Sequence, residues 1–189
     1  MTPVSDQVRA LAEQIELVIL DVDGVLTDGT LAYTETGEQV KNFNAKDGFG
    51  IRMMQESGIE VAVITARKSP PLARRMNDLK IRHFFTGFDN KIDAYQQLIS
   101  QLQLPPGHVA YVGDDVLDLP VMRQVGLPIA VGDAHFYAKE TALWTTTECG
   151  GHGAVREVAD MLISCRQNLY EAYDRFLNQR VGKSDLDKV

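Results

Sequence analysis

Four short runs of apolar residues, spaced along the chain, most constrain what it can fold into. They lie at 17–20, 61–64, 109–112 and 129–131, and each is short and apolar enough to be a buried strand. Segments with helical spacing lie between them, such as the one carrying Ile92, Tyr95, Leu98 and Leu102, and Ser69-Pro70 is typical of a helix start. This alternation predicts an α/β fold with a doubly wound, Rossmann-like parallel sheet and helices on both faces.

Two further segments do not follow the alternation. Residues 30–33 and 39–43 flank a Glu-Thr-Gly-Glu turn and predict a β-hairpin inserted after the first strand. The segment from Gly153 carries apolar residues on one face, which predicts one long amphipathic helix ending near Asn178, followed by a polar, mobile tail from Arg180 to Val189. We expect one domain spanning residues 1–189, because 189 residues supply one core but not two.

Composition excludes several classes of protein. A net charge of −7 and a pI near 5.1 argue against a protein that grips nucleic acid, and 44% hydrophobic residues argue against disorder. The sequence shows neither a secretory signal nor an apolar run long enough to span a membrane, so a cytoplasmic location is expected. Cys149 and Cys165 are too few for a disulfide framework, and we expect both to be reduced thiols.

Polar side chains follow the predicted strands at the edge where parallel sheets bind ligands. Asp21 and Asp23 follow the first run and Thr65 the second, and the run at 109–112 leads into Asp114 and its neighbours Asp115 and Asp118. Lys91 opens the helix that follows a short predicted strand at 83–86. Asp21 and Asp23 are two residues apart and can point the same way, with Asp114 approaching from a neighbouring strand.

These residue types favour phosphoryl transfer. Converging carboxylates need a cation, and hard oxygen ligands around an open position suit Mg²⁺. Lys91 and the Thr65 hydroxyl would stabilise the phosphoryl oxygens. Asp21 would then be the nucleophile that forms an aspartyl phosphate, and Asp23 the acid that protonates the leaving alcohol and the base that activates water.

Other interpretations of these residues are more ordinary. An isolated Asp-x-Asp is usually a solvated turn or a helix cap, and it is the order of Asp21, Thr65, Lys91 and Asp114 that makes coincidence improbable. Asp115 can equally be part of the site or cap the helical turn at 116–117. His152 lies in the Gly-rich loop 150–153, where a role for the backbone is the simpler explanation.

The ordered motifs resemble those of the haloacid dehalogenase-like phosphatases. They are Asp21-Val-Asp23-Gly-Val-Leu-Thr27, Thr65, Lys91 and Gly113-Asp114-Asp115-x-x-Asp118. Four longer stretches, at 44–52, 65–68, 110–115 and 150–158, resemble the 3-deoxy-D-manno-octulosonate 8-phosphate (Kdo 8-phosphate) phosphatases. The sequence departs from the family at Ala66, where Gly is common, and at His152, where close relatives often have another residue.

The resemblance implies roles for further residues. It implies that Mg²⁺ is bound by Asp21, the Asp23 backbone carbonyl and Asp114, with Asp115 and Asp118 in support. It also implies that a sugar acid phosphate is bound by Asp23, Asn44, Ala45, Lys46, Asp47, Gly48, Arg52, Arg67, Arg75 and Lys91. Similar enzymes acting on nine-carbon acids tend to have an acidic residue at the position of Arg67, so the arginine favours the eight-carbon acid.

The resulting prediction is a Mg²⁺-dependent phosphatase of Kdo 8-phosphate, acting in lipopolysaccharide biosynthesis. The same chemistry on a nine-carbon, sialic-acid-type 9-phosphate is the nearest alternative. A receiver-like phosphoacceptor domain is more remote. Receivers place an acidic pair after the first strand and the acceptor Asp alone after a later strand, whereas here Asp21 and Asp23 come first and a cluster of acidic residues comes later. A catalytically silent scaffold would require a lost nucleophile, whereas Asp21 is present.

The chain has no room for a separate cap domain, and the hairpin is too small to close a site alone. We therefore expect neighbouring subunits to complete each active site, and the resemblance implies a homotetramer built around the hairpins.

Overall fold

The computed structural model describes residues 3–35 and 37–184. Within that part of the chain, a six-stranded sheet has the order β5-β4-β1-β6-β7-β8, and all its neighbouring strands run parallel. The strands are β1 (Leu17–Leu20), β4 (Glu60–Thr65), β5 (His83–Thr86), β6 (Val109–Gly113), β7 (Leu127–Ala130) and β8 (Trp144–Thr145). The predicted strands are confirmed, whereas the two-residue β8 was too short to leave a pattern.

The central strand β1 explains why the core forms here. All four of its residues are buried, and it pairs with β4 on one side and β6 on the other, so that Leu17 is opposite both Glu60 and Val109. A strand covered on both faces is apolar throughout rather than alternating, as the sequence Leu-Val-Ile-Leu is.

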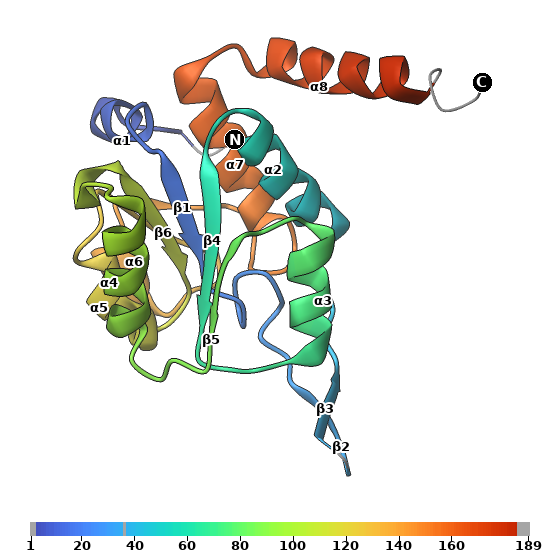
Figure 1. Ribbon diagram of the computed structural model, residues 1–189. Coiled ribbons are helices and arrows are strands. Elements are labelled where there is room, and N and C mark those ends of the chain that lie inside the picture. Colours follow the sequence, from blue (N-terminus) through green and yellow to red (C-terminus); the bar gives the residue numbers. More distant parts are fainter. Residues whose placement is uncertain (1–2, 36, 185–189) are drawn as a thin grey trace.

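Helices cover both faces of the sheet (Figure 1). On one side lie α2 (Ala45–Glu56), α3 (Pro70–Asp78) and α7 (Ala154–Arg166), and on the other lie α4 (Lys91–Leu102), α5 (Leu119–Met122) and α6 (Phe136–Thr141). The N-terminal α1 (Asp6–Ala12) contacts α7 and β7, and two short 3₁₀ turns, η1 (Pro106–His108) and η2 (Val116–Asp118), flank β6. The predicted doubly wound α/β fold is confirmed. No helix among the described residues combines the length and the apolarity needed to cross a bilayer.

Asparagine side chains begin two of the helices that follow the carboxyl edge of the sheet. The Asn44 side chain accepts a hydrogen bond from the Lys46 amide at the start of α2, and Asn90 accepts one from the Ile92 amide at the start of α4. Each cap satisfies an amide that has no partner within its helix, so the position of the first turn is fixed.

The predicted hairpin is present and consists of β2 (Ala32–Thr34) and β3 (Gly37–Val40), paired antiparallel. It projects from the body of the molecule beyond the edge of the sheet (Figure 1). Tyr33 and Val40 on it are 61% and 54% exposed.

The C-terminal segment differs from the predicted single helix. Helix α7 ends at Arg166, and a second helix, α8 (Leu169–Ser184), starts in a new direction (Figure 1). The Asn168 side chain accepts hydrogen bonds from the amides of Tyr170 and Glu171, which caps α8. The helix also continues past Asn178, and residues 185–189 of the predicted mobile tail lie outside the described residues.

Candidate active site

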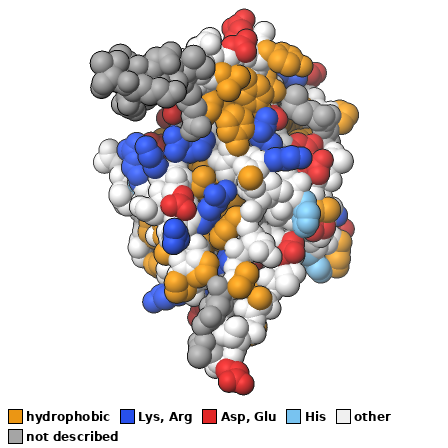
Figure 2. Space-filling view, turned by 90° about the vertical axis from the view of Figure 1, so that its right-hand side faces the viewer, with side chains coloured by type: hydrophobic (Ala, Val, Ile, Leu, Met, Phe, Trp, Pro, Cys, Tyr) orange, Lys and Arg blue, Asp and Glu red, His pale blue; other side chains and the backbone are white. Residues whose placement is uncertain are grey.

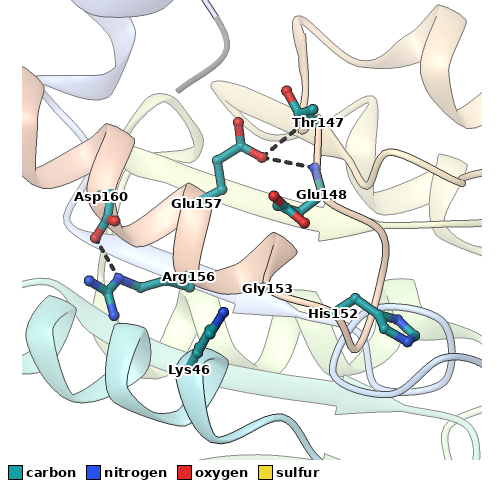
Figure 3. A pocket seen from close by; sticks show the side chains of 8 residues that line it. All are labelled: Lys46, Thr147, Glu148, His152, Gly153, Arg156, Glu157 and Asp160. Carbon is teal, nitrogen blue, oxygen red and sulfur yellow. Dashed lines mark hydrogen bonds and ion pairs between the residues drawn. The ribbon is translucent and has the colours of Figure 1, made fainter.

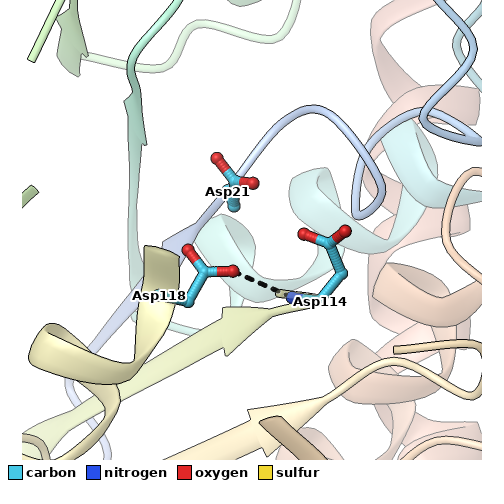
Figure 4. A group of neighbouring side chains, drawn as sticks. All are labelled: Asp21, Asp114 and Asp118. Carbon is cyan, nitrogen blue, oxygen red and sulfur yellow. Dashed lines mark hydrogen bonds between the residues drawn. The ribbon is translucent and has the colours of Figure 1, made fainter. Parts of the chain in front are cut away.

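The carboxyl edge of the sheet brings the predicted catalytic residues together. Asp21 follows β1, Thr65 ends β4, Asp114 follows β6, and Lys91 is the first residue of α4 after β5. Figure 4 shows Asp21, Asp114 and Asp118 facing one another across this edge. One carboxylate oxygen from each lies within 4.8 Å of the others. Neighbouring parallel strands therefore place residues that are far apart in the sequence at one point.

Asp118 accepts hydrogen bonds from several neighbouring groups of the site. One of its oxygens accepts hydrogen bonds from the Lys91 ammonium at 2.6 Å and from the Tyr111 hydroxyl at 2.6 Å. The other accepts from the backbone amides of Asp114 at 2.9 Å and Asp115 at 3.2 Å. With four donors already on its two oxygens, Asp118 orients the site, and its supporting role in metal binding stays a prediction.

Lys91 lies between two of the carboxylates. Its ammonium is 2.8 Å from Asp21 and 2.6 Å from Asp118, and its side chain is only 6% exposed. Burial alone would lower the pKa of Lys91, but the charges of Asp21 and Asp118 outweigh it and raise that pKa. Lys91 is therefore a permanent positive charge beside the nucleophile.

The donor set fits a divalent cation. Burial, followed by the charge of Asp118, raises the pKa of Asp21 to about 6, and burial together with Asp21 and Asp118 raises the pKa of Asp114 to about 8. One lysine thus does not offset the mutual repulsion of these carboxylates. Asp21 and Asp114 have oxygens directed toward a common point, and oxygen ligands in such a group suit Mg²⁺. We infer that a cation there would restore both carboxylates to their ionised form.

Gly24 makes room for Asp114. Its φ of +98° lies in the left-handed region, and a Cβ added there would lie 2.0 Å from Oδ2 of Asp114. A side chain at this position would strain the backbone and also push Asp114 out of the cluster. The glycine after Asp23 therefore follows from the geometry of the site as well as from the turn.

Two cations hold Asp23. Its Oδ1 pairs with the Lys41 ammonium, and its Oδ2 is 3.6 Å from Nε of Arg67. Arg67 in turn donates a hydrogen bond to the Tyr33 hydroxyl of the hairpin at 2.8 Å. Sequence reasoning predicted Arg67 but missed Lys41 and Tyr33, which lie on the hairpin and not after a strand of the main sheet.

Thr65 and Asp115 occupy different surroundings. Thr65 is 2% exposed, and its hydroxyl accepts a hydrogen bond from the Arg67 amide at 3.3 Å, so it also shapes the turn after β4. Asp115 is exposed, and its side chain accepts from the Val116 amide at the start of η2. Of the two interpretations of Asp115, the structure therefore shows the helical cap.

Several groups of the stretch 44–48 make hydrogen bonds to other parts of the chain. The Asp47 carboxylate is 1% exposed and accepts from the Gly153 and Arg156 amides at the start of α7, at 3.3 and 2.9 Å. Arg75 donates to the Asn44 carbonyl at 3.3 Å, and a Cβ on Gly48 would lie 2.1 Å from the Arg75 guanidinium. A substrate contact by Asp47, Gly48 or Arg75 stays a prediction.

The Gly-rich loop 150–153 lies between this stretch and the turn that follows Asp21. Its Gly151 amide donates to the Val25 carbonyl at 2.9 Å, and its Gly151 carbonyl accepts from the Asn44 amide group at 3.2 Å. The His152 ring nitrogen Nδ1 is 2.8 Å from the Gly150 carbonyl, in agreement with a role in shaping the loop.

Two other predicted residues, Lys46 and Arg52, line pockets away from Asp21. Lys46 lies with His152 and Arg156 in a pocket of about 300 Å³ at the starts of α2 and α7 (Figure 3). Arg52 lines another, of about 350 Å³, with Lys80 and Arg82 near the opposite end of β4. Neither pocket is lined by Asp21, Asp23, Thr65 or Lys91. Figure 2 shows Lys and Arg side chains gathered on the face that carries α3 and the hairpin.

Comparisons with known proteins agree with this geometry. Residues 81–157 match the model of the haloacid dehalogenase-like hydrolases. The 3-deoxy-D-manno-octulosonate 8-phosphate phosphatase KdsC of Escherichia coli (strain K12) is 49% identical over 170 residues, which is 90% of each chain.

Solved structures agree as well. The crystal structure of the Yersinia pestis 3-deoxy-D-manno-octulosonate 8-phosphate phosphatase superimposes with a TM-score of 0.86 at 46% identity, covering 89% of this chain and 91% of that one. The Moraxella catarrhalis enzyme, solved with magnesium, phosphate and Kdo, gives a TM-score of 0.87 at 35% identity over 92% and 99% of the two chains. The chain therefore belongs to the 3-deoxy-D-manno-octulosonate 8-phosphate phosphatases of the haloacid dehalogenase-like hydrolases.

Proposed function

We propose that this protein is a Mg²⁺-dependent phosphomonoesterase that hydrolyses Kdo 8-phosphate to Kdo and phosphate. The observation that carries the proposal is the cluster around Asp21, a buried carboxylate with a permanent cation on one oxygen and Asp114 beside it. Curated relatives at 49% identity and the Moraxella catarrhalis complex, which contains magnesium, phosphate and Kdo, support both the reaction and the substrate.

Asp21 and Asp114, together with the Asp23 backbone carbonyl, would hold the metal ion. When bound, Mg²⁺ supplies positive charge to the phosphoryl oxygens and keeps the Asp21 carboxylate ionised at neutral pH. Lys91 supplies a further charge from the protein side, and the Thr65 hydroxyl supplies a neutral donor.

Two displacements at phosphorus complete the reaction. An Asp21 oxygen forms a bond to phosphorus as the bond from phosphorus to the sugar oxygen breaks, and Asp23 gives its proton to that leaving oxygen. Water then loses a proton to Asp23 and forms the new bond to phosphorus, while the bond to Asp21 breaks and phosphate is released. Lys91 remains beside Asp21 throughout and offsets the negative charge that develops.

Substrate recognition falls to cations around the mouth of the site. Arg67 is 45% exposed at its side chain, lies beside Asp23 and is fixed by Tyr33, so its guanidinium can bind a sugar carboxylate or hydroxyl. This arginine also favours the eight-carbon acid over a nine-carbon one. The stretch 44–48 and Arg75 would frame the sugar, whereas Arg52 lines the pocket near the start of β4, and its contact with the substrate stays a prediction.

The first prediction tests the reaction and the substrate together. Phosphate release is measured for a panel of 2-keto sugar acid phosphates with eight and nine carbons, in the presence of Mg²⁺ and of a chelator. We expect the highest kcat/KM for Kdo 8-phosphate, and an activity that disappears with the chelator.

Asp21→Asn is the matched control, because it keeps the shape of the side chain and removes the nucleophile. Full activity in that variant would contradict the covalent mechanism. A clear preference for the nine-carbon substrate would reject the substrate but not the chemistry.

We further propose a homotetramer in the cytoplasm, acting on the pathway to lipopolysaccharide. The exposed hairpin residues Tyr33 and Val40 and the 45% exposed Arg67 side chain support an assembly in which neighbouring subunits complete the site.

A further inference from the structure

Lys41 has no assigned role in this site, yet it is one of the most buried charged side chains of the hairpin region. It follows β3 on the segment that returns to α2, and its side chain is 2% exposed. Its ammonium pairs with Oδ1 of Asp23, a residue 18 positions earlier in the chain. Removing a lysine from water is costly unless a specific partner repays it, so this contact fixes both side chains in one arrangement.

The two oxygens of Asp23 are not equivalent. Oδ1 pairs with the buried Lys41, whereas Oδ2 lies 3.6 Å from Nε of Arg67, whose side chain is 45% exposed. Lys41 therefore decides which oxygen remains available to the substrate. Each of the two carboxylates that react has its own buried lysine, because Lys91 lies against Asp21 in the same way.

We propose that Lys41 is a positioning residue for the acid–base step: it holds Asp23 by Oδ1 so that Oδ2 faces the oxygen of the leaving alcohol. The inference rests on the proposed phosphatase function. Oδ2 gives its proton to that oxygen as the bond from phosphorus to the sugar oxygen breaks, and it takes a proton from water in the second displacement. Lys41 itself exchanges no proton with the substrate in either step.

The leaving group distinguishes this role from a merely structural one. A sugar alkoxide is a poor leaving group that needs a proton, whereas p-nitrophenolate departs without one. The value of kcat/KM reports the steps up to the departure of the first product, so it isolates proton donation from the later hydrolysis of the aspartyl phosphate.

The experiment compares Lys41→Met with the wild type on Kdo 8-phosphate and on p-nitrophenyl phosphate. Because general acid catalysis contributes about 10²- to 10⁴-fold, we expect kcat/KM to fall by about 100-fold or more on the sugar phosphate and by less than about tenfold on the aryl phosphate. Lys41→Arg, which keeps the charge, should recover part of the loss. If the wild type prefers another sugar phosphate, that compound replaces Kdo 8-phosphate and the test of Lys41 is unaffected.

Lys91→Met is the matched control. Since Lys91 lies against the nucleophile, its loss should lower kcat/KM by similar factors on both substrates. Equal losses on both substrates for Lys41→Met, or no loss on either, would overturn the proposal.

A double-mutant cycle completes the test. If Lys41 acts through Asp23, Lys41→Met added to Asp23→Asn should lower kcat/KM on the sugar phosphate little further. Additive losses would show that Lys41 acts on its own and would contradict the proposal. Circular dichroism and thermal unfolding establish that each variant is folded, and Lys41→Gln, which keeps a hydrogen-bond donor, replaces Lys41→Met if the latter is not.

Discussion

At the scale of single residues, the site is an arrangement of carboxylates that repel one another until a cation joins them. Asp21 and Asp114 have pKa values raised to about 6 and about 8, chiefly by burial and by their acidic neighbours. Asp118 cannot relieve them, because its oxygens already accept four hydrogen bonds. The metal-free protein is therefore expected to carry protons at Asp21 and Asp114 that the unfolded chain would release.

A second prediction follows for the dependence of stability on pH. Folded-state pKa values above the unfolded ones mean that the folded state binds more protons, so metal-free protein loses stability as pH rises from about 4 to about 8. Mg²⁺ competes with those protons, so it should raise the melting temperature more at pH 8 than at pH 5.5. Differential scanning fluorimetry with chelator or Mg²⁺ measures both effects.

Asp114→Asn is the control for this prediction, because it removes the group with the higher pKa and a metal ligand together. The extra stabilisation by Mg²⁺ at pH 8 should be lost in this variant. A melting temperature that responds to Mg²⁺ equally at both pH values in the wild type would contradict the prediction.

The sequence pattern predicted the site residues that follow strands of the main sheet, but it did not predict Lys41, which contacts Asp23 from the hairpin segment. Asp21, Thr65, Lys91 and Asp114 each follow a run of apolar residues, and parallel strands bring such positions to one edge. Lys41 reaches Asp23 only because of the path of the hairpin, which a pattern of local hydrophobicity does not encode. A lysine on an insertion next to a predicted site is the one signal that could have pointed to it.

At the scale of elements, the segment 44–48 connects two helices through one carboxylate. Asn44 caps its own helix α2, while Asp47 caps α7, more than a hundred residues further along the chain. The buried pair of helices thus begins at the same place and is oriented by the same short segment. Asp47 therefore has a structural role as the cap of α7, which its position in a family motif did not reveal.

The third prediction concerns this cap. Asp47→Ala removes the acceptor for the Gly153 and Arg156 amides, and loss of such a cap costs about 0.5–2 kcal/mol, so we expect a decrease in the free energy of unfolding in that range. Asp47→Asn keeps an acceptor and should lose less. Urea denaturation of both variants, followed by circular dichroism, measures the difference, and equal stability of Asp47→Ala and the wild type would show that the cap is not needed.

The break between α7 and α8 was missed although the sequence contained a signal for it. Asn168 is a good N-cap residue, but the apolar spacing continues past it through Leu169, Tyr173 and Phe176. In the structure, those residues pack against Phe49 and Met53 of α2 from a helix that has changed direction. Periodicity alone does not distinguish one long helix from two that pack against the same neighbour.

At the scale of the whole molecule, the hairpin is the feature that a lone subunit does not explain. It leaves Tyr33 and Val40 exposed on a projection, and the described residues place no cap domain over Asp21. An assembly of subunits would bury these side chains and close the sites at once.

The last prediction tests this assembly. Val40→Asp places a charge on the exposed hairpin face, so it should shift the protein from a tetramer toward smaller species, as measured by size-exclusion chromatography with light scattering. Because the sites would open, activity should fall with the loss of assembly. Lys139→Asp on α6, outside the hairpin, is the control and should leave the tetramer intact. A wild-type protein that elutes as a stable monomer would contradict the proposal.

The length of the hairpin turn sets the relative positions of two residues of the site, which is not so for an ordinary surface turn. Surface turns usually tolerate insertions and deletions, because nothing else depends on their register. Here Tyr33 lies on one arm and Lys41 just after the other, and they hold Arg67 and Asp23 respectively. A single residue gained or lost between them would shift one arm against the other and misalign the pair. The length of this turn is therefore expected to be kept among related chains.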